Sequence, residues 1–104
     1  MPVMIQPHNI SIPMQDIESF CRRNKILRLA VFGSVTRHDF TASSDIDMLV
    51  EFAPGTRLGF DFFRIQDELS KLLGRSVEMT TPDGLRNAYR KGILDTAQDI
   101  YVAA

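Results

Sequence analysis

The sequence predicts one α/β (α+β) domain, in which helices pack on one face of a small mixed β-sheet. Short apolar strand patterns alternate along the chain with longer segments of helical periodicity. The composition is 44% hydrophobic and 24% charged, which is typical of a folded globular domain. The 104 residues match the size of a single domain, 1–104, whose first ten residues look like a loose lead-in.

Charge and cysteine content exclude several classes of protein. Lys and Arg total 12 and Asp and Glu total 13, so direct nucleic-acid binding is not expected. The single cysteine, Cys21, excludes an intrachain disulfide and a cysteine-based metal cluster. No segment approaches the roughly 20 apolar residues of a membrane span, and the N-terminus lacks a signal-peptide pattern. The expected location is the cytoplasm, without membrane contact.

The first half of the chain predicts a helix followed by two strands. The helix covers Ile12–Asn24, with Ser11 as its N-cap and Cys21 on its apolar side. Residues 26–32 form a short apolar run that predicts a buried strand. Residues 45–52 alternate in character, so one strand face carries Ile46, Met48, Val50 and Phe52, and the other carries Asp45, Asp47, Leu49 and Glu51. Between these strands we expect a helical turn over residues 34–38 and a loop over 41–44.

The second half predicts two more helices and two more strands. After a turn at Pro54 and Gly55, helical spacing over residues 58–73 predicts a helix that ends at Gly74. Asp67 and Lys71 lie four residues apart on it and predict an ion pair. The remaining expected elements are a strand over 77–80, a helix over 83–98 opened by Pro82, and a short last strand over 99–103.

Asp45 and Asp47 are candidate metal ligands and catalytic residues. Residues i and i+2 of a strand share one face, with α-carbons roughly 6.6–6.8 Å apart. Two ionised carboxylates this close repel each other unless a cation neutralises them, and Mg²⁺ prefers carboxylate, water and phosphate oxygens. The alternative interpretation is an exposed acidic pair on the solvent face of a half-buried strand.

Gly33 and Ser34 end the preceding strand and are candidate nucleotide-binding residues. Glycine lets backbone approach a ligand closely, and the start of a helix offers unpaired N–H groups to an anion. Arg37 adds a charged donor for phosphate, and Ser44, next to Asp45, completes the candidate nucleotide-binding set. The alternative is a tight turn in which Ser34 caps the helix.

Glu78 is the third candidate acid. It alternates with Val77 and Met79 in the predicted third strand, so it lies on the opposite face from these apolar residues. If the sheet places it beside Asp45 and Asp47, three carboxylates share one site, which suits a second metal ion or a general base. The alternative is an exposed glutamate on a strand face. The sequence lacks a phosphate loop of the G-x-x-x-x-G-K-[ST] type.

The Gly33-Ser34 pair followed, after residues 35–44, by Asp45-Ile46-Asp47 resembles the signature of the DNA polymerase β-like nucleotidyltransferase superfamily. The short chain and the segment SVEMTTPDGLRNAYRKGILDTAQDIYV resemble its minimal nucleotidyltransferase group. The resemblance implies the polymerase β-like core fold, Gly33 and Ser34 as the triphosphate-binding turn, and Asp45 and Asp47 as metal ligands. Glu78 falls where this family commonly has a third carboxylate, usually aspartate.

The resemblance also implies a cofactor, a substrate and a partner. The cofactor is Mg²⁺, as two ions, and the substrate is ATP. Many members of the group are encoded beside a HEPN-domain protein, and characterised members neutralise this RNase toxin by transferring AMP to a toxin tyrosine. The resemblance therefore implies a HEPN-domain toxin as the partner, with a hetero-oligomer as one form of the association. Two other hypotheses stay open: an antitoxin that only occludes its toxin, and a nucleotidyltransferase acting on a small molecule or an RNA end.

Overall fold

The computed structural model describes residues 2–6, 10–33, 45–84 and 87–103. Within these residues the chain forms strands, helices and one 3₁₀ turn. In chain order they are β1 (Val3–Met4), α1 (Met14–Arg23), β2 (Ile26–Phe32), β3 (Ile46–Phe52), α2 (Asp61–Leu73), β4 (Val77–Thr80), the 3₁₀ turn Pro82–Gly84, α3 (Asn87–Thr96) and β5 (Gln98–Val102). None of the helices described is long and apolar enough to cross a membrane.

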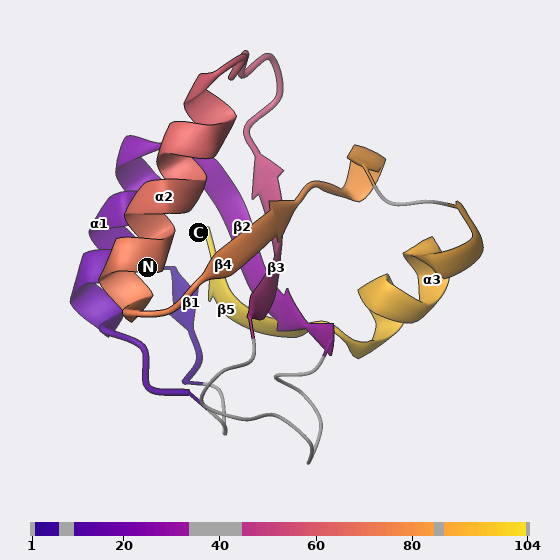
Figure 1. The fold of residues 1–104 in the computed structure, drawn as a ribbon, viewed down its shortest axis with the longest axis horizontal. Helices are drawn as coiled ribbons and strands as arrows, with labels where there is room; N and C mark the ends of the chain where they lie inside the picture. The colour runs from indigo at the N-terminus through magenta and orange to yellow at the C-terminus, as the bar shows by residue number, and fades with distance from the viewer. Residues whose placement is uncertain (1, 7–9, 34–44, 85–86, 104) are drawn as a thin grey trace.

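The strands form one mixed sheet in the order β1-β5-β2-β3-β4 (Figure 1). Most neighbouring pairs are antiparallel, namely β1 with β5, β5 with β2, and β2 with β3. The pair β3 and β4 is parallel, because α2 carries the chain back along the sheet between them. This connection brings the first residues of β3 and β4 to the same end of the sheet, next to the last residues of β2.

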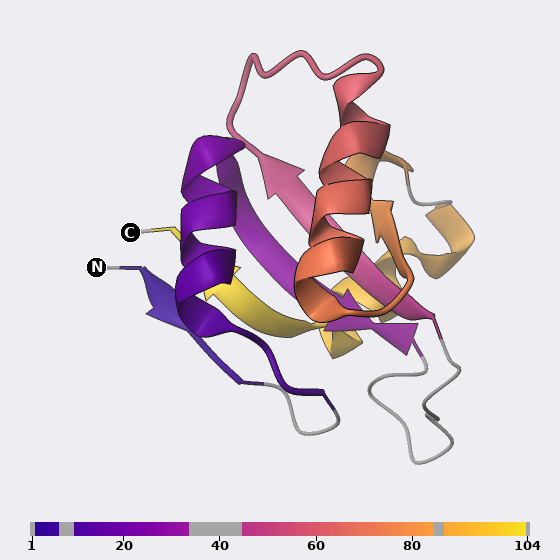
Figure 2. The same ribbon diagram turned by 60° about the vertical axis from the view of Figure 1, so that its left-hand side comes forward.

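The main core lies between the sheet and the helices α1 and α2. Both helices pack on one face, and α3 lies on the far side of the sheet (Figures 1 and 2). Helical spacing turns one stripe of each helix inward, and alternate strand residues meet it. The core residues include Ile17, Phe20, Cys21, Leu29, Val31, Ile46, Met48, Val50, Ile65, Leu69 and Ile100.

Residues in the middle of the sheet are also buried on the face opposite α1 and α2. Ala30 of β2 and Leu49 of β3 are paired across the two strands and are both fully buried, although they point away from the main core. The face that carries Asp47 and Glu51 is therefore not a plain solvent face, which weakens the alternative interpretation of Asp45 and Asp47 as a surface pair.

The predicted α+β class with a mixed sheet is confirmed, as are most predicted elements. The helices were all expected on one face of the sheet, whereas α3 lies on the face opposite α1 and α2. Strands 26–32 and 77–80 have the predicted bounds, Cys21 is buried, and Asp67 and Lys71 form an exposed ion pair of 3.4 Å. The predicted segments over residues 34–38 and 41–44 lie outside the described residues.

Three local predictions are wrong. The N-cap of α1 is Pro13 and not Ser11. The side-chain amide of Gln6 donates to the carbonyl of Ile12 and accepts from its N–H, so Ile12 is bonded to Gln6 and does not begin the helix. The helix predicted over 83–98 is divided into the turn Pro82–Gly84 and α3. The lead-in contains β1, a strand of two residues that only its pairing with β5 defines.

Candidate functional site

The candidate site lies where the end of β2 and the starts of β3 and β4 meet. Phe32 pairs with Asp47, and Asp47 pairs with Glu78, so these residues form one row across three strands. Paired residues point to the same face, which here is the face away from α1 and α2. We call this place, formed by Phe32–Gly33, Asp45–Asp47 and Glu78, the acidic end of the sheet.

Gly33 fits closely against the carboxylate of Asp47. Its φ is +74°, a conformation that side-chain-bearing residues adopt only with strain. A Cβ atom at Gly33 would lie 2.6 Å from Oδ2 of Asp47. Glycine is therefore required twice here, by the backbone conformation and by the space that the carboxylate occupies. The sequence indicated a close backbone approach at Gly33, and the group that approaches is a carboxylate of the same site.

Asp47 and Glu78 bring two carboxylates together on neighbouring strands. Strands in a sheet lie about 4.8 Å apart, so side chains in register are direct neighbours. Asp47 is half-buried and Glu78 is exposed. From the sequence, a three-acid site depended on whether the sheet places Glu78 beside the aspartates, and the register places it beside Asp47.

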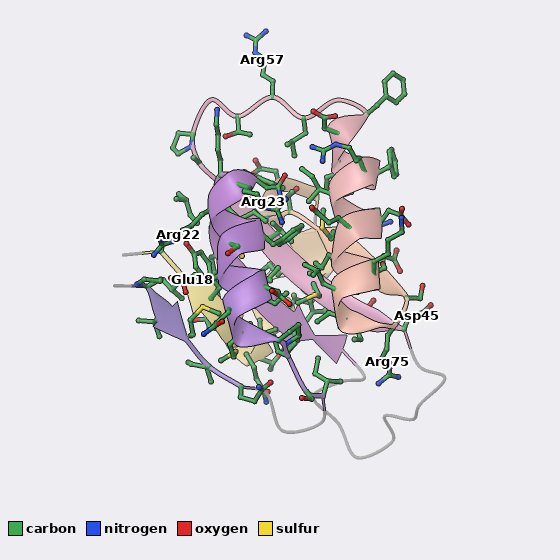
Figure 3. All side chains as sticks on the ribbon, turned by 90° about the vertical axis from the view of Figure 1, so that its left-hand side faces the viewer. Glu18, Arg22, Arg23, Asp45, Arg57 and Arg75 are labelled. Carbon is green, nitrogen blue, oxygen red and sulfur yellow. The ribbon has the colours of Figure 1, made fainter. Side chains whose placement is uncertain are left out.

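Asp45 stands just outside the strand at the same end of the sheet. It is exposed, and β3 begins at the next residue, whose N–H donates to the carbonyl of Ser76 at 2.9 Å. This bond brings Asp45 near Arg75, a half-buried residue that was not among the sequence-predicted site residues. Figure 3 shows both at one end of the molecule, with Arg57 at the other. The parallel start of β3 and β4 thus places Arg75 at the same end of the sheet as Asp45.

The opposite end of the same face carries a different charged cluster. Arg28 of β2 donates to Asp99 of β5 at 2.6 Å and to Glu51 of β3 at 3.2 Å. Partial burial lowers the pKa of Arg28, but the hydrogen bonds to Asp99 and Glu51 outweigh this effect and raise it. Glu51 shares a face with Asp47 but lies at the opposite end of the strand, where it accepts a hydrogen bond from Arg28, so we interpret it as a structural acid.

Three of the predicted nucleotide-binding residues, Ser34, Arg37 and Ser44, lie outside the described residues. Of the predicted set, the structure brings together Gly33, Asp47 and Glu78, and it places Asp45 at the same end. The assignments of these residues to catalysis, nucleotide binding and metal binding stay predictions.

The acids at this end suit Mg²⁺ in chemistry and in number. Within the described residues, no three His, Cys, Asp or Glu side chains are grouped so as to hold a metal ion. Mg²⁺, however, is usually held by one or two carboxylates together with substrate phosphates and water. Asp47 and Glu78 provide two such carboxylates on one face, and Asp45 lies just beyond them. A site of this kind is completed by its nucleotide.

Two surface cavities lie away from the acidic end. One of about 460 Å³ is lined by residues 50–56, Leu58 and residues 81–83, and one of about 580 Å³ lies beside Arg28, Glu51 and Phe52. Both cavities lie at the C-terminal end of β3, whereas Asp47 lies at its N-terminal end. They are separate from the row of acids and are not part of the candidate site.

The mixed sheet, Gly33 against Asp47, and Glu78 on the neighbouring strand match the arrangement expected of a nucleotidyltransferase core. In agreement, the nucleotidyltransferase domain family matches residues 14–100. The chain belongs to this family and is an enzyme of the nucleotidyltransferase class.

Relatives in sequence are named as protein adenylyltransferases. A candidate protein adenylyltransferase of Methanocaldococcus jannaschii is 33% identical over 92 residues, which cover 88% of this chain and 98% of that protein. The protein adenylyltransferase MntA of Thermococcus cleftensis is 28% identical over 91 residues, covering 80% of this chain and 91% of the relative.

Solved structures share the fold. A candidate minimal nucleotidyltransferase superposes with a TM-score of 0.67 at 36% identity, over 81% of this chain and 85% of the other. A toxin–antitoxin structure with AMP-PNP superposes with a TM-score of 0.70 at 17% identity, over 88% of this chain and 75% of the other. At such low identity, this second likeness concerns the fold alone.

Proposed function

We propose that this chain is an antitoxin that transfers AMP from Mg-ATP to a tyrosine hydroxyl of a HEPN-domain RNase toxin. The observation that carries the proposal is the position of Asp47, whose carboxylate lies against Gly33 and whose strand position pairs with Glu78. Relatives named as protein adenylyltransferases support AMP transfer to a protein. Structures of MntA–HepT toxin–antitoxin pairs with the same fold support a toxin as the partner.

The proposed reaction is a displacement at the α-phosphorus of ATP. The acceptor oxygen forms a bond to this phosphorus, the bond to the bridging oxygen of the β-phosphate breaks, and pyrophosphate leaves. Glu78 orients the acceptor hydroxyl and takes its proton, while Gly33 and Ser34 hold the triphosphate through backbone and hydroxyl donors. Asp47 and Glu78, with Asp45 at the same end of the sheet, would hold Mg²⁺, which when bound would neutralise the charge that develops on the phosphate oxygens.

The test is co-expression with the partner toxin. Wild-type protein is expected to leave an AMP adduct on a partner tyrosine, detected by mass spectrometry, and to restore growth. The variants Asp45→Asn, Asp47→Asn and Glu78→Gln remove one negative charge each and are expected to abolish or strongly reduce the adduct. Glu51→Gln is the matched control, because Glu51 lies on the same strand face but bonds Arg28.

The two remaining hypotheses give different results in this experiment. If the Asp45→Asn/Asp47→Asn double variant neutralises the toxin fully and the wild-type pair carries no adduct, the protein acts by occlusion and the enzymatic proposal falls. An adduct found on RNA or on a small molecule, with none on the partner, assigns the acceptor to that class.

A further inference from the structure

The outer edge of β4 is bonded to side chains of α2. In the parallel pair of β3 and β4, alternate residues of β4 direct their N–H groups away from β3. Two such groups have partners on the helix. The N–H of Val77 donates to Oγ of Ser70 at 3.1 Å, and the N–H of Met79 donates to Oε1 of Gln66 at 2.8 Å.

The geometry of a helix explains why this pair of side chains matches a strand. Gln66 and Ser70 lie four residues apart on α2, a rise of about 6.0 Å along the helix axis. Val77 and Met79 lie two residues apart on β4, about 6.6 Å along the strand. The helix therefore presents two acceptors at nearly the spacing of the two donors, in antiparallel order.

The acceptor groups are themselves held in place. The hydroxyl of Ser70 donates to the carbonyl of Gln66 at 3.0 Å, which leaves its oxygen lone pairs for Val77. Ile65 and Leu69, the neighbours of Gln66 and Ser70 on the helix, are buried in the core and fix the rotation of α2. The acceptors that bond β4 are therefore held on a helix whose rotation about its axis is fixed by core packing.

Glu78 is the residue between the two bonded groups. Its neighbours Val77 and Met79 are bonded through their N–H groups to α2, and their side chains are buried in the core. The side chain of Glu78 leaves from the opposite face, where it is in register with Asp47. We propose that Gln66 and Ser70 are positioning residues that set the place of the Glu78 carboxylate relative to Asp47.

This proposal rests on the role proposed for Glu78 in metal binding. Groups hydrogen-bonded directly to a metal ligand typically change metal affinity by 10–100-fold when they are lost. Gln66 and Ser70 act one step further away, through the backbone on either side of Glu78, so we expect an effect at the lower end of this range. We therefore expect removal of either acceptor to weaken metal binding through Glu78, although neither residue lies on the face of the site.

The experiment measures Mn²⁺ affinity in the presence of AMP-PNP, by the electron paramagnetic resonance signal of free Mn²⁺, after the Mn²⁺ that AMP-PNP binds without protein has been subtracted. Gln66→Met and Ser70→Ala remove an acceptor, and each is expected to raise the Kd of Mn²⁺ about ten-fold. Gln66→Glu and Ser70→Thr keep an acceptor oxygen and are expected to stay near wild type. Hydrogen exchange at the amides of Val77 and Met79 is expected to accelerate only in the first two variants.

A double-mutant cycle separates positioning from general loss of stability. In a Glu78→Gln background, Gln66→Met is expected to cause no further loss of Mn²⁺ affinity, because the group that it positions is already altered. Ile17→Val destabilises the core from α1, away from β4, and controls for lowered stability with Mn²⁺ affinity unchanged.

The outcomes distinguish this proposal from the proposed function. If Glu78→Gln leaves Mn²⁺ affinity unchanged, Glu78 is no metal ligand, and both the proposed role and the positioning role fall. If Glu78→Gln weakens Mn²⁺ binding while Gln66→Met and Ser70→Ala do not, only the positioning role falls. A loss in Gln66→Met that persists in the Glu78→Gln background also overturns it.

Discussion

At the scale of single residues, Gly33 combines a left-handed backbone conformation with close contact to the carboxylate of Asp47. Its φ of +74° and the 2.6 Å that would separate a Cβ atom from Oδ2 of Asp47 are two separate requirements for glycine. Gly55 has a similar φ of +81°, but nothing lies within 4 Å of the position that its Cβ atom would take. The two glycines therefore allow conformational strain to be separated from contact with the site.

We expect Gly55→Ala to lower the free energy of unfolding by about 1–2 kcal/mol, the cost of a left-handed conformation with a side chain. Gly33→Ala is expected to cost about 1–3 kcal/mol more, because the methyl group also displaces the Asp47 carboxylate. It should weaken Mg-ATP binding, which Gly55→Ala should spare. Urea unfolding and nucleotide titration measure both effects, and equal losses of stability would show that Asp47 moves aside without cost.

Cys21 makes the stability of the fold depend on pH. Burial raises the pKa of its thiol from 9.0 to about 12. The neutral thiol is favoured in the folded state, so its contribution is fully present below pH 9. As the pH rises from 9 towards 12, the unfolded chain loses this proton first, and the contribution is lost.

The free energy of unfolding should therefore fall above pH 9 by at most about 1.4 kcal/mol per pH unit on account of Cys21. Cys21→Ala removes the thiol and should show a shallower decline, although it is less stable at neutral pH. The measurement is urea unfolding of both proteins from about pH 7 to about pH 10.5, which spans the onset of thiol ionisation in the unfolded chain. If the two proteins lost stability in parallel over this pH range, the result would contradict a raised pKa of the Cys21 thiol in the folded state.

At the scale of secondary-structure elements, Arg28 connects three strands. Its guanidinium group bonds Asp99 of β5 and Glu51 of β3 from its own place on β2. Because the side chain is only 25% exposed, its loss leaves two partly covered carboxylates without their cation. This differs from the ion pair of Arg22 with Glu18, which lies on the surface of one helix.

We expect Arg28→Met to lower the free energy of unfolding by about 1.5–3 kcal/mol, the range for hydrogen bonds to charged groups. Arg22→Met is the matched control and should cost about 0.5 kcal/mol or less, as exposed pairs within a helix do. Urea unfolding of both variants at neutral pH checks the difference. Equal effects would mean that solvent replaces the Arg28 bonds at little cost.

The sequence predicted elements better than it predicted their contacts. Strand β2 has the predicted bounds because it is a mostly apolar run that ends before Gly33. Strand β4 has them because apolar and polar residues alternate along it and Pro82 follows shortly after. Strand β1 escaped prediction because two residues carry no periodicity, and only β5 defines them. The place of the acids was predictable from Gly33, Asp45 and Asp47, which lie close in the sequence.

The register of Glu78 with Asp47 was not predictable from the pattern, because it depends on how α2 returns the chain to the sheet. The same is true of Gln66 and Ser70. A signal for them did exist: two hydrogen-bonding residues with helical spacing lie beside the apolar stripe of α2, shortly before a strand. Recognising their partners required the three-dimensional arrangement.

At the scale of the whole molecule, the acidic end brings together carboxylates from two neighbouring strands. Asp47 and Glu78 are neighbours on one face, and like charges directly opposite each other in a sheet are destabilising. Under the proposed function, a ligand that brings Mg²⁺ to this end would offset the repulsion between these carboxylates and would bind the folded chain. Nucleotide binding and the stability of the fold should therefore be linked.

We expect Mg-ATP at about 100 times its Kd to raise the free energy of unfolding by about 2.7 kcal/mol. For a domain of this size the rise in Tm is on the order of 10–20 °C. ATP with EDTA should raise Tm much less, because the triphosphate then adds negative charge to the acidic end.

Asp47→Asn should be as stable as wild type without ligand, or slightly more so, and should lose most of the rise in Tm that Mg-ATP causes. Glu51→Gln, on the same face but outside the acidic end, should keep it. Thermal unfolding followed by circular dichroism measures all of these cases, and the absence of a shift with several millimolar Mg-ATP would contradict a nucleotide site at this end of the sheet.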